Sequence, residues 1–118
     1  MKLEGEGLLV RIFVGESDRW EGAPLYDAIV QRARDKGLAG ATVLKGIEGF
    51  GAHNFIHTAR IQLHAEDLPI VIEIVDQREK VEAFLPELDE LISEGLVTLE
   101  PVRVILYRVR DEGSRATH

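Results

Sequence analysis

The order of the segments with regular hydrophobic periodicity constrains the fold of this chain more than any other feature. Apolar residues alternate or run together in several short stretches, and a period of two residues is typical of β-strands. Two longer segments with helical periodicity lie between them, at residues 24–36 and 76–94. The strand-like segments are residues 8–14, 41–46, 70–75 and 102–109. The predicted order is therefore strand, helix, strand, strand, helix, strand.

The first helical segment carries a start signal and a stop signal. Pro24 fits the first helical turn, where its missing N–H costs no hydrogen bond, and Gly37 fits the C-terminal cap. The second segment is identified by an unbroken apolar stripe at helical spacing. The stripe consists of Val81, Phe84, Leu85, Leu88, Leu91 and Ile92.

The second helix carries further signals at its ends and in its middle. Asp76 and Glu79 resemble a capping box at its start, and Gly95 is expected to close it. Pro86 lies inside the apolar stripe and should remove one backbone hydrogen bond. Because the stripe continues through this proline, we predict one helix with a kink near Glu82.

Two such halves form a ferredoxin-like βαββαβ sandwich, an α+β fold whose four-stranded antiparallel sheet carries both helices on one face. Pro101 is expected to separate a short extended piece from the last strand. We predict one domain over residues 1–118, with flexible termini at 1–7 and 110–118. The other sheet face would be bare and apolar, so we expect an oligomer. Its apolar residues would be Leu9 or Val10, Val71, Val75, Ile105 and Tyr107.

The charge and composition exclude several classes of protein. The net charge of −7 argues against a nucleic-acid partner and against attachment to an anionic membrane surface. The absence of cysteine excludes disulfides and thiol catalysis. No apolar run approaches the roughly 20 residues of a membrane span, and residues 1–4 do not resemble a signal peptide. We therefore expect a cytoplasmic protein.

The stretch GIEGFGAHNFIH, residues 46–57, combines glycines, histidines and phenylalanines at high density. Glycine is favoured where φ is positive or where the backbone approaches a ligand closely. Gly49 and Gly51 would then line a site for an anionic or planar ligand, with Arg103 or Arg108 neutralising its charge. The alternative is that these glycines form only a β-bulge and a turn.

The histidines of this stretch allow a second interpretation. His53 and His57 have the spacing of a helical metal-ligand pair, and His64 follows them. With these ligands the chain would be comparable to the trimeric CutA divalent-cation-tolerance proteins. The neighbouring glycines disfavour the helix that such a pair needs, so ordinary loop histidines are the competing explanation.

The chain shows no catalytic constellation. Its serines are not in a nucleophile-elbow context, and the glycines match neither a dinucleotide-binding nor a Walker pattern. Carboxylate pairs for acid–base chemistry carry little weight, because 21 acids make chance proximity frequent. Candidates for such a pair are Glu16, Asp18, Glu48 and Glu73. We therefore expect neither an enzyme nor a cofactor.

Several separated motifs resemble those of PII signalling proteins. In chain order they are GLxGxTV at 37–43, GFG at 49–51, LP at 68–69 before IEIV at 72–75, and VRVI at 102–105. A closer resemblance, to the PII-like domain of unknown function 190 (UPF0166), rests on GESDR at 15–19, GIEGFG at 46–51 and IEIVD at 72–76. The resemblance covers residues 8–108.

This resemblance implies a homotrimer that binds a small-molecule effector, of the adenine-nucleotide type, between neighbouring subunits. It also implies a T-loop that reports the ligand state to a partner such as a membrane transporter or an enzyme. Gly40 and Thr42 would lie near the base, and Arg108 would face phosphates. The ligand-binding residues implied in this way are Gly40, Thr42, Gly49, Phe50, Gly51, Ala52, His53, Glu73, Val75 and Arg108.

The chain also departs from the PII pattern. Residues 93–100 contain two acids and no lysine, where PII proteins carry a glycine- and lysine-rich phosphate clamp. Ala52 and His53 stand near the position of a PII glutamine, and the tyrosines, Tyr26 and Tyr107, lie outside the T-loop. We therefore do not expect nitrogen sensing of the PII type. A nucleotide with fewer phosphates, a cyclic or dinucleotide form, or another small anion fits better.

Overall fold

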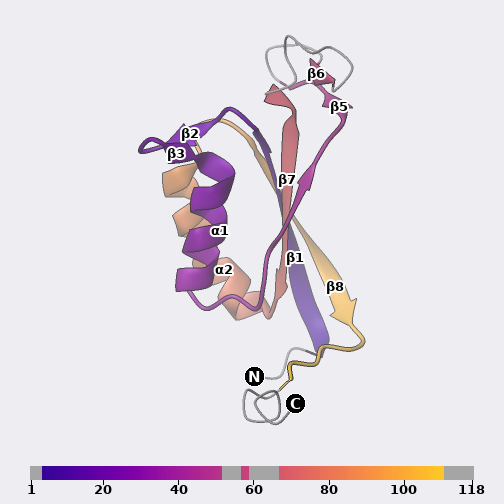
Figure 1. Cartoon of the computed structure of the whole chain (residues 1–118). Coiled ribbons are helices and arrows are strands. Elements are labelled where there is room, and N and C mark those ends of the chain that lie inside the picture. The colour runs from indigo at the N-terminus through magenta and orange to yellow at the C-terminus, as the bar shows by residue number, and fades with distance from the viewer. Residues whose placement is uncertain (1–3, 52–56, 59–66, 111–118) are drawn as a thin grey trace.

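The computed structural model describes residues 4–51, 57–58 and 67–110. In this part of the chain a four-stranded antiparallel sheet carries two helices on one face (Figure 1). The strand order across the sheet is β4-β7-β1-β8. The elements are β1 (Gly5–Gly15), α1 (Leu25–Asp35), β4 (Thr42–Lys45), β7 (Pro69–Asp76), α2 (Arg78–Leu91) and β8 (Leu96–Val104). The predicted ferredoxin-like βαββαβ sandwich is confirmed.

Two short hairpins extend from this sandwich. β2 (Arg19–Trp20) pairs with β3 (Ala23–Pro24) directly before α1. β5 (Glu48–Gly49) pairs with β6 (His57–Thr58), at the end of the sheet opposite the connection between α1 and β4 (Figure 1). The glycine-rich stretch is thus attached to one end of the sheet, away from the connection that follows α1.

The hydrophobic core lies between the sheet and the two helices. At its centre Val10 pairs with Ile74 and Ile12 with Ile72, and none of these side chains is more than 1% exposed. Phe84 of α2 is buried to the same degree. Full burial of one such side chain contributes about 1.5–3 kcal/mol. The remaining core residues are Leu8, Val14, Leu25, Ile29, Ala33, Ile70, Val81, Leu88 and Leu91.

Helix α1 ends as its sequence predicts. Gly37 has a φ of +79°, in the left-handed region that glycine adopts without steric cost. The Leu38 N–H donates to the carbonyl of Ala33 at 3.1 Å, and the Gly37 N–H donates to that of Arg34 at 3.1 Å. These two bonds form a Schellman motif, which satisfies the last carbonyls of the helix. At the other end Pro24 occupies the N-cap rather than the first turn.

The predicted capping box and stop signal of α2 are wrong, although the helix itself and its stripe are confirmed. Gln77 is the N-cap, because Asp76 is the buried last residue of β7 and accepts a hydrogen bond from Ala39 N–H at 2.8 Å. The helix ends at Leu91, before Gly95. A Cβ at Gly95 would lie 2.8 Å from the carbonyl oxygen of Phe13, so this glycine permits close approach to β1.

Pro86 and Pro101 each lie inside a regular element, and only the first was predicted to do so. Pro86 lies inside one continuous α2, as predicted, while the kink near Glu82 stays a prediction. Pro101 was expected to interrupt the chain, and this expectation is wrong: β8 runs through it, with Pro101 opposite Leu8. Since β8 is an edge strand, a residue without an N–H can be accommodated on its unpaired side.

The sheet face without helices carries alternating apolar and charged pairs. Side chains on this face are partly exposed in the single chain. Leu9 rather than Val10 belongs to it, since Val10 is fully buried on the helix side. Ile105 and Tyr107 were also expected there, but β8 ends at Val104 and both lie beyond the sheet. Its central cross-strand pairs are Leu9 with Val75, Arg11 with Glu73, and Phe13 with Val71.

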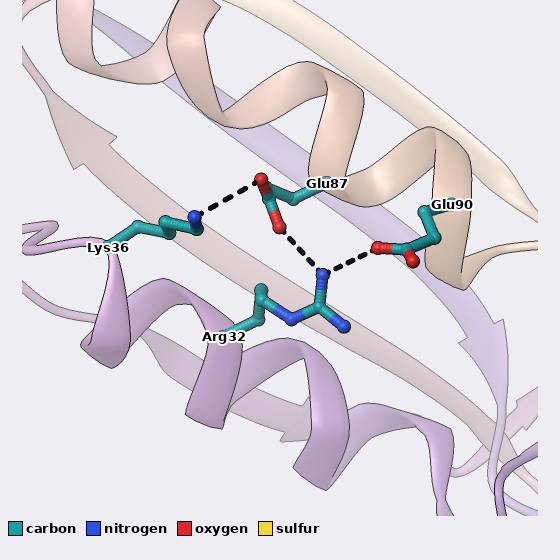
Figure 2. A network of polar contacts seen from close by, with 4 residues as sticks. All are labelled: Arg32, Lys36, Glu87 and Glu90. Carbon is teal, nitrogen blue, oxygen red and sulfur yellow. Dashed lines mark hydrogen bonds and ion pairs between the residues drawn. The ribbon is translucent and has the colours of Figure 1, made fainter.

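An ion-pair network joins the two helices (Figure 2). Arg32 of α1 lies 2.6 Å from the Glu87 carboxylate and 2.7 Å from that of Glu90, both on α2. Lys36 lies 3.5 Å from the second oxygen of Glu87. Hydrogen bonding from Arg32 lowers the pKa of Glu87, with Lys36 adding to the effect, and the Glu90 hydrogen bond raises the pKa of Arg32.

Candidate functional site

Two glycines of residues 46–51 lie so close to Pro69 that a side chain would have little or no room. A Cβ at Gly46 would lie 2.7 Å from Pro69 Cγ, and one at Gly49 would lie 3.1 Å from the same atom. The Gly46 N–H also donates to the Pro69 carbonyl at 2.7 Å. Neither glycine has a positive φ, and a Cβ at Gly51 would meet no atom within 4 Å. Close approach to β7 therefore requires Gly46 and leaves little room for a side chain at Gly49, whereas Gly51 is free of this constraint.

The turn after β1 contacts the chain on both sides of residues 46–66, at Lys45 and at Asp67–Leu68. Lys45, at the end of β4, lies 2.8 Å from Glu16. On the returning side, the Ser17 hydroxyl donates to Asp67 at 2.5 Å, and the Glu16 N–H donates to the Leu68 carbonyl at 2.9 Å. Residues 15–18 therefore have a structural role, since they connect β4 and the segment before β7. Glu16 forms an ion pair with Lys45 rather than a catalytic carboxylate pair.

Glu73 lies among the charged residues Arg11 and Glu100 on the sheet face that carries no helix, called here the open sheet face. Its carboxylate accepts a hydrogen bond from Arg11 Nε at 2.8 Å, and Arg11 Nη1 lies 3.1 Å from Glu100. The Glu73 hydrogen bond is the main reason why the pKa of Arg11 is raised. Thr42 pairs with Glu73 in the β4–β7 register. Glu73 was a candidate for an acid–base carboxylate pair, but within the described chain its carboxylate is bonded to Arg11.

A cavity of about 220 Å³ lies where α1 ends and the chain turns toward β4. Its lining is mainly apolar and includes one cation, Arg34. In the described part of the chain Arg34 makes no ion pair. The lining residues are Val30, Ala33, Arg34, Leu38, Ala39, Gly40 and Ala41. A planar apolar group with a neighbouring negative charge suits these walls, since flat ligands bind in apolar pockets with a few polar groups.

The single chain separates the predicted ligand-binding residues into groups. Gly40 lines the cavity, and Thr42, Glu73 and Val75 lie close to that end of β4 and β7. The segment 49–51 lies at the opposite end of β4, beside the β5–β6 hairpin (Figure 1). The structure therefore brings the first group together and keeps the second apart from it.

Three other predicted residues fall outside these groups. Arg108 was placed on the last strand, but it follows the end of β8 and is exposed. Ala52 and His53 lie outside the described residues. Conversely, sequence reasoning missed Arg34 and Asp76 as parts of the cavity and its support. Arg34 could have been found from the sequence by its position in the last turn of α1, three residues before Gly37.

Metal binding and membrane insertion find no support in the described residues. Within them no group of three or more histidines, cysteines or acids has a geometry that could hold a metal. The histidines on which the metal-binding alternative depends have no described side chains. Among the helices of residues 4–51 and 67–110, none is long and apolar enough to cross a membrane.

Comparison with known proteins gives consistent results for sequence and structure. The profile of the DUF190 family, described as "Uncharacterized ACR, COG1993", matches residues 7–104. A UPF0166 protein of Aquifex aeolicus is 41% identical over 97 residues, which cover 82% of this chain and 91% of the relative. A UPF0166 protein of Methanocaldococcus jannaschii is 34% identical over 97 residues, covering 81% and 89%.

Solved structures of PII-like proteins share the fold at low sequence identity. A putative PII-like signaling protein of Thermus thermophilus superimposes with a TM-score of 0.62 at 19% identity, covering 89% of this chain and 94% of the other. CPII of Thiomonas intermedia, a nitrogen regulatory PII-like protein bound to ADP, AMP and bicarbonate, gives a TM-score of 0.59 at 17% identity. That match covers 84% of this chain and 88% of CPII.

Proposed function

The chain belongs to the DUF190 (UPF0166) family and has a PII-like fold, and from this premise we propose that it is a non-enzymatic regulatory protein. In this proposal it binds a small anionic metabolite, an adenine nucleotide being the first candidate, between the subunits of a homotrimer. The observation that carries the proposal is the apolar cavity beside Gly40 and Arg34, on the fold that CPII uses with bound ADP and AMP.

The separation of the predicted ligand-binding residues supports an intersubunit site. Gly40 and the segment 49–51 lie at opposite ends of β4, so one small ligand can contact both only if a second subunit contributes one of them. The open sheet face, with Leu9, Phe13 and Val71 partly exposed, supports self-association, because exposed apolar faces of this kind are usually covered. The trimer is the assembly that the resemblance to PII proteins implies, and it would meet both conditions.

The charges of the cavity lining and of residues 93–103 favour a ligand with few phosphates. Residues 93–100 carry Glu94 and Glu100 and no lysine, so they supply no phosphate clamp. Among the described residues, Arg34 at the cavity and Arg103 on β8 make no ion pair, so both are available to a bound anion. A nucleoside monophosphate or diphosphate places its base in the apolar cavity and needs fewer cations than a triphosphate.

Signalling would pass through the glycine-rich stretch. The turn at residues 15–18 contacts the chain before and after residues 46–66, through the Lys45–Glu16 pair and the Ser17–Asp67 hydrogen bond. A ligand that shifts this segment between two arrangements would present a different surface to a transporter or an enzyme. Such a shift requires only that the ligand bind one arrangement more tightly than the other.

Calorimetric titration of the purified protein with AMP, ADP, ATP and a cyclic dinucleotide tests the proposal. We expect saturable binding of at least one of these ligands, with AMP or ADP tighter than ATP. Gly40→Leu should weaken it, because Gly40 lines the cavity and a Cβ there meets no atom within 4 Å, so the fold can accept a larger side chain in the cavity wall. Ala83→Leu, on the exposed side of α2, is the matched control and should bind normally.

Two outcomes of this titration would contradict the proposal. If none of the nucleotides binds at millimolar concentration, the nucleotide part of the proposal is wrong. If binding occurs and Gly40→Leu leaves it unchanged, the ligand lies elsewhere on the molecule. Native mass measurement of the same samples reports whether the binding species is a trimer.

A further inference from the structure

We propose that Asp76 is the positioning residue of the cavity: its buried carboxylate holds the Ala39 backbone and so sets the shape that the ligand's flat group must fit. This inference rests on the proposed function, because the cavity is the one assigned there to the ligand. Asp76 would not touch the ligand. It would act through the segment 38–41, which forms one wall of the cavity.

The geometry of Asp76 differs from that of an ordinary helix cap. The residue is fully buried at the end of β7. Oδ2 accepts a hydrogen bond from Ala39 N–H at 2.8 Å, and Oδ1 accepts one from Gln77 N–H at 2.7 Å. One carboxylate thus joins the turn after α1 to the start of α2, and Asp76 lies 37 residues from Ala39 in the sequence.

A buried carboxylate is costly unless hydrogen bonds and nearby positive charge compensate it. Here two amide N–H groups supply hydrogen bonds, and α2 begins directly after Gln77. The N-terminus of a helix carries partial positive charge, which favours an anion at this position. The carboxylate of Asp76 is therefore held in place, and its position determines where the Ala39 backbone lies.

The other contacts of the turn do not replace this hydrogen bond. Leu38 N–H is bonded to Ala33, at the end of α1, and Lys80 Nζ donates to the Gly37 carbonyl at 2.9 Å. Both contacts hold the part of the turn before Ala39. Gly40 and Ala41, which line the cavity, lie between the Ala39 hydrogen bond and the start of β4 at Thr42. Loss of the Asp76 contact would therefore loosen the cavity wall and leave the helix end intact.

The test is Asp76→Asn, compared with Ile74→Val in the same strand. An asparagine offers one acceptor oxygen, so one of the two backbone N–H groups would face its NH₂ group. Ile74 is 1% exposed and does not line the cavity, so Ile74→Val weakens the core without removing a hydrogen bond of the turn. Two quantities are measured in each protein: amide hydrogen exchange at residues 39–41, and calorimetric affinity for ADP.

We expect Asp76→Asn to speed exchange at residues 39–41 and to raise the Kd for ADP by roughly tenfold, because apparent affinity falls with the fraction of molecules that have the binding-competent wall. Ile74→Val should change neither the exchange rate at residues 39–41 nor the Kd for ADP, although both variants should lower the melting temperature. This difference separates positioning from a general loss of stability. Native mass should stay that of the wild-type protein in both variants.

Three results would overturn the inference. The first is a Kd for Asp76→Asn within twofold of a wild-type protein that binds ADP. The second is an equal loss of affinity in Ile74→Val. The third needs no variant: exchange of the wild-type Ala39 amide as fast as in the exposed turn at residues 93–95. If Asp76→Asn does not fold, Asp76→Ser, which is smaller and keeps one hydroxyl acceptor, carries the same measurements.

Failure of the proposed function gives a different pattern. In that case wild-type protein binds no nucleotide, while hydrogen exchange still reports whether Asp76 fixes the segment 39–41. Slow wild-type exchange that becomes fast in Asp76→Asn would then support the structural part of the inference and reject only its ligand.

Discussion

Arg11 Nε lies 2.8 Å from the Glu73 carboxylate, across the two central strands, on the sheet face that carries no helix. Glu100 of β8 approaches the same guanidinium at 3.1 Å. On β1 the neighbours of Arg11 on this face are apolar, Leu9 and Phe13. A charged group can be buried against a partner only when it is paired and hydrogen-bonded. The pairing of Arg11 therefore makes this face compatible with burial in an assembly.

The assembly can be tested by one substitution on this face. Val71→Asp should give a monomer in sedimentation equilibrium, because it places an unpaired carboxylate beside Phe13 in the proposed interface. Its circular dichroism should remain that of the wild-type protein, since Val71 lies outside the helix-covered core. Ala83→Asp, on the exposed side of α2, should keep the wild-type mass. A monomeric wild-type protein, or a Val71→Asp variant of unchanged mass, would contradict the proposed interface.

The close contact of Gly46 with Pro69 predicts a cost for any side chain there. Gly46→Ala should lower the free energy of unfolding by about 1–3 kcal/mol, the usual range for overpacking, because its Cβ would lie 2.7 Å from Pro69 Cγ. Gly51→Ala, with no atom within 4 Å, should be close to neutral. Urea unfolding measures both, and Pro69→Ala should rescue part of the Gly46→Ala loss. Equal stability of the Gly46→Ala and Gly51→Ala variants would show that the contact is not limiting.

The network of Figure 2 predicts a pH dependence of stability. Hydrogen bonding from Arg32 lowers the pKa of Glu87 below its ordinary 4.5. A carboxylate whose pKa is lower in the folded state stabilises the fold above its unfolded pKa, and this contribution is lost as the pH falls through the folded value. The stability advantage of wild-type protein over Glu87→Gln should therefore be present at neutral pH and shrink below pH 4.5. Urea midpoints at neutral and acidic pH measure it.

A pH-independent difference between wild type and Glu87→Gln would contradict this assignment. The effect should also weaken at high ionic strength, because the network is partly exposed and salt screens such pairs. Glu82→Gln, at an exposed pair with Arg78, serves as the control and should show a smaller dependence.

Arg34 is the cation of the cavity lining, and its removal should weaken anion binding. Arg34→Ala should raise the Kd for AMP or ADP by roughly ten- to a hundredfold, the range that corresponds to the loss of one hydrogen bond to a charged group. Arg78→Ala, an exposed arginine of α2, is the matched control. Calorimetry at two salt concentrations measures both. If Arg34→Ala binds as well as the control, the negative group of the ligand does not lie at the cavity.

Much of the fold follows from local patterns. The alternation of Val10 and Ile12 with polar or surface residues predicts β1, and the stripe through Phe84 predicts α2, because apolar spacing alone selects the face that must be buried. The Gly37 cap was equally predictable, since its left-handed φ and the two Schellman hydrogen bonds are local. The family resemblance then supplied the list of ligand-binding positions, and the structure places the described ones, apart from Arg108, at two ends of β4.

The remaining features depend on contacts between distant segments. Asp76 looks like a cap in sequence, yet its partner is Ala39, and no local pattern records a hydrogen bond across 37 residues. Pro101 looks like a break, but it lies on an edge strand where its missing N–H costs little. Gly46 owes its identity to Pro69 of another strand.

The sequence by itself therefore determined the order of the elements and the faces that they bury, because periodicity is a property of neighbouring residues. Only the tertiary structure decided which carboxylate supports the cavity, which glycines are required and where the cavity lies. Each of these is settled by atoms that meet only after the chain has folded. The cavity contains one residue of each kind: the family resemblance implied Gly40, and the structure added Arg34.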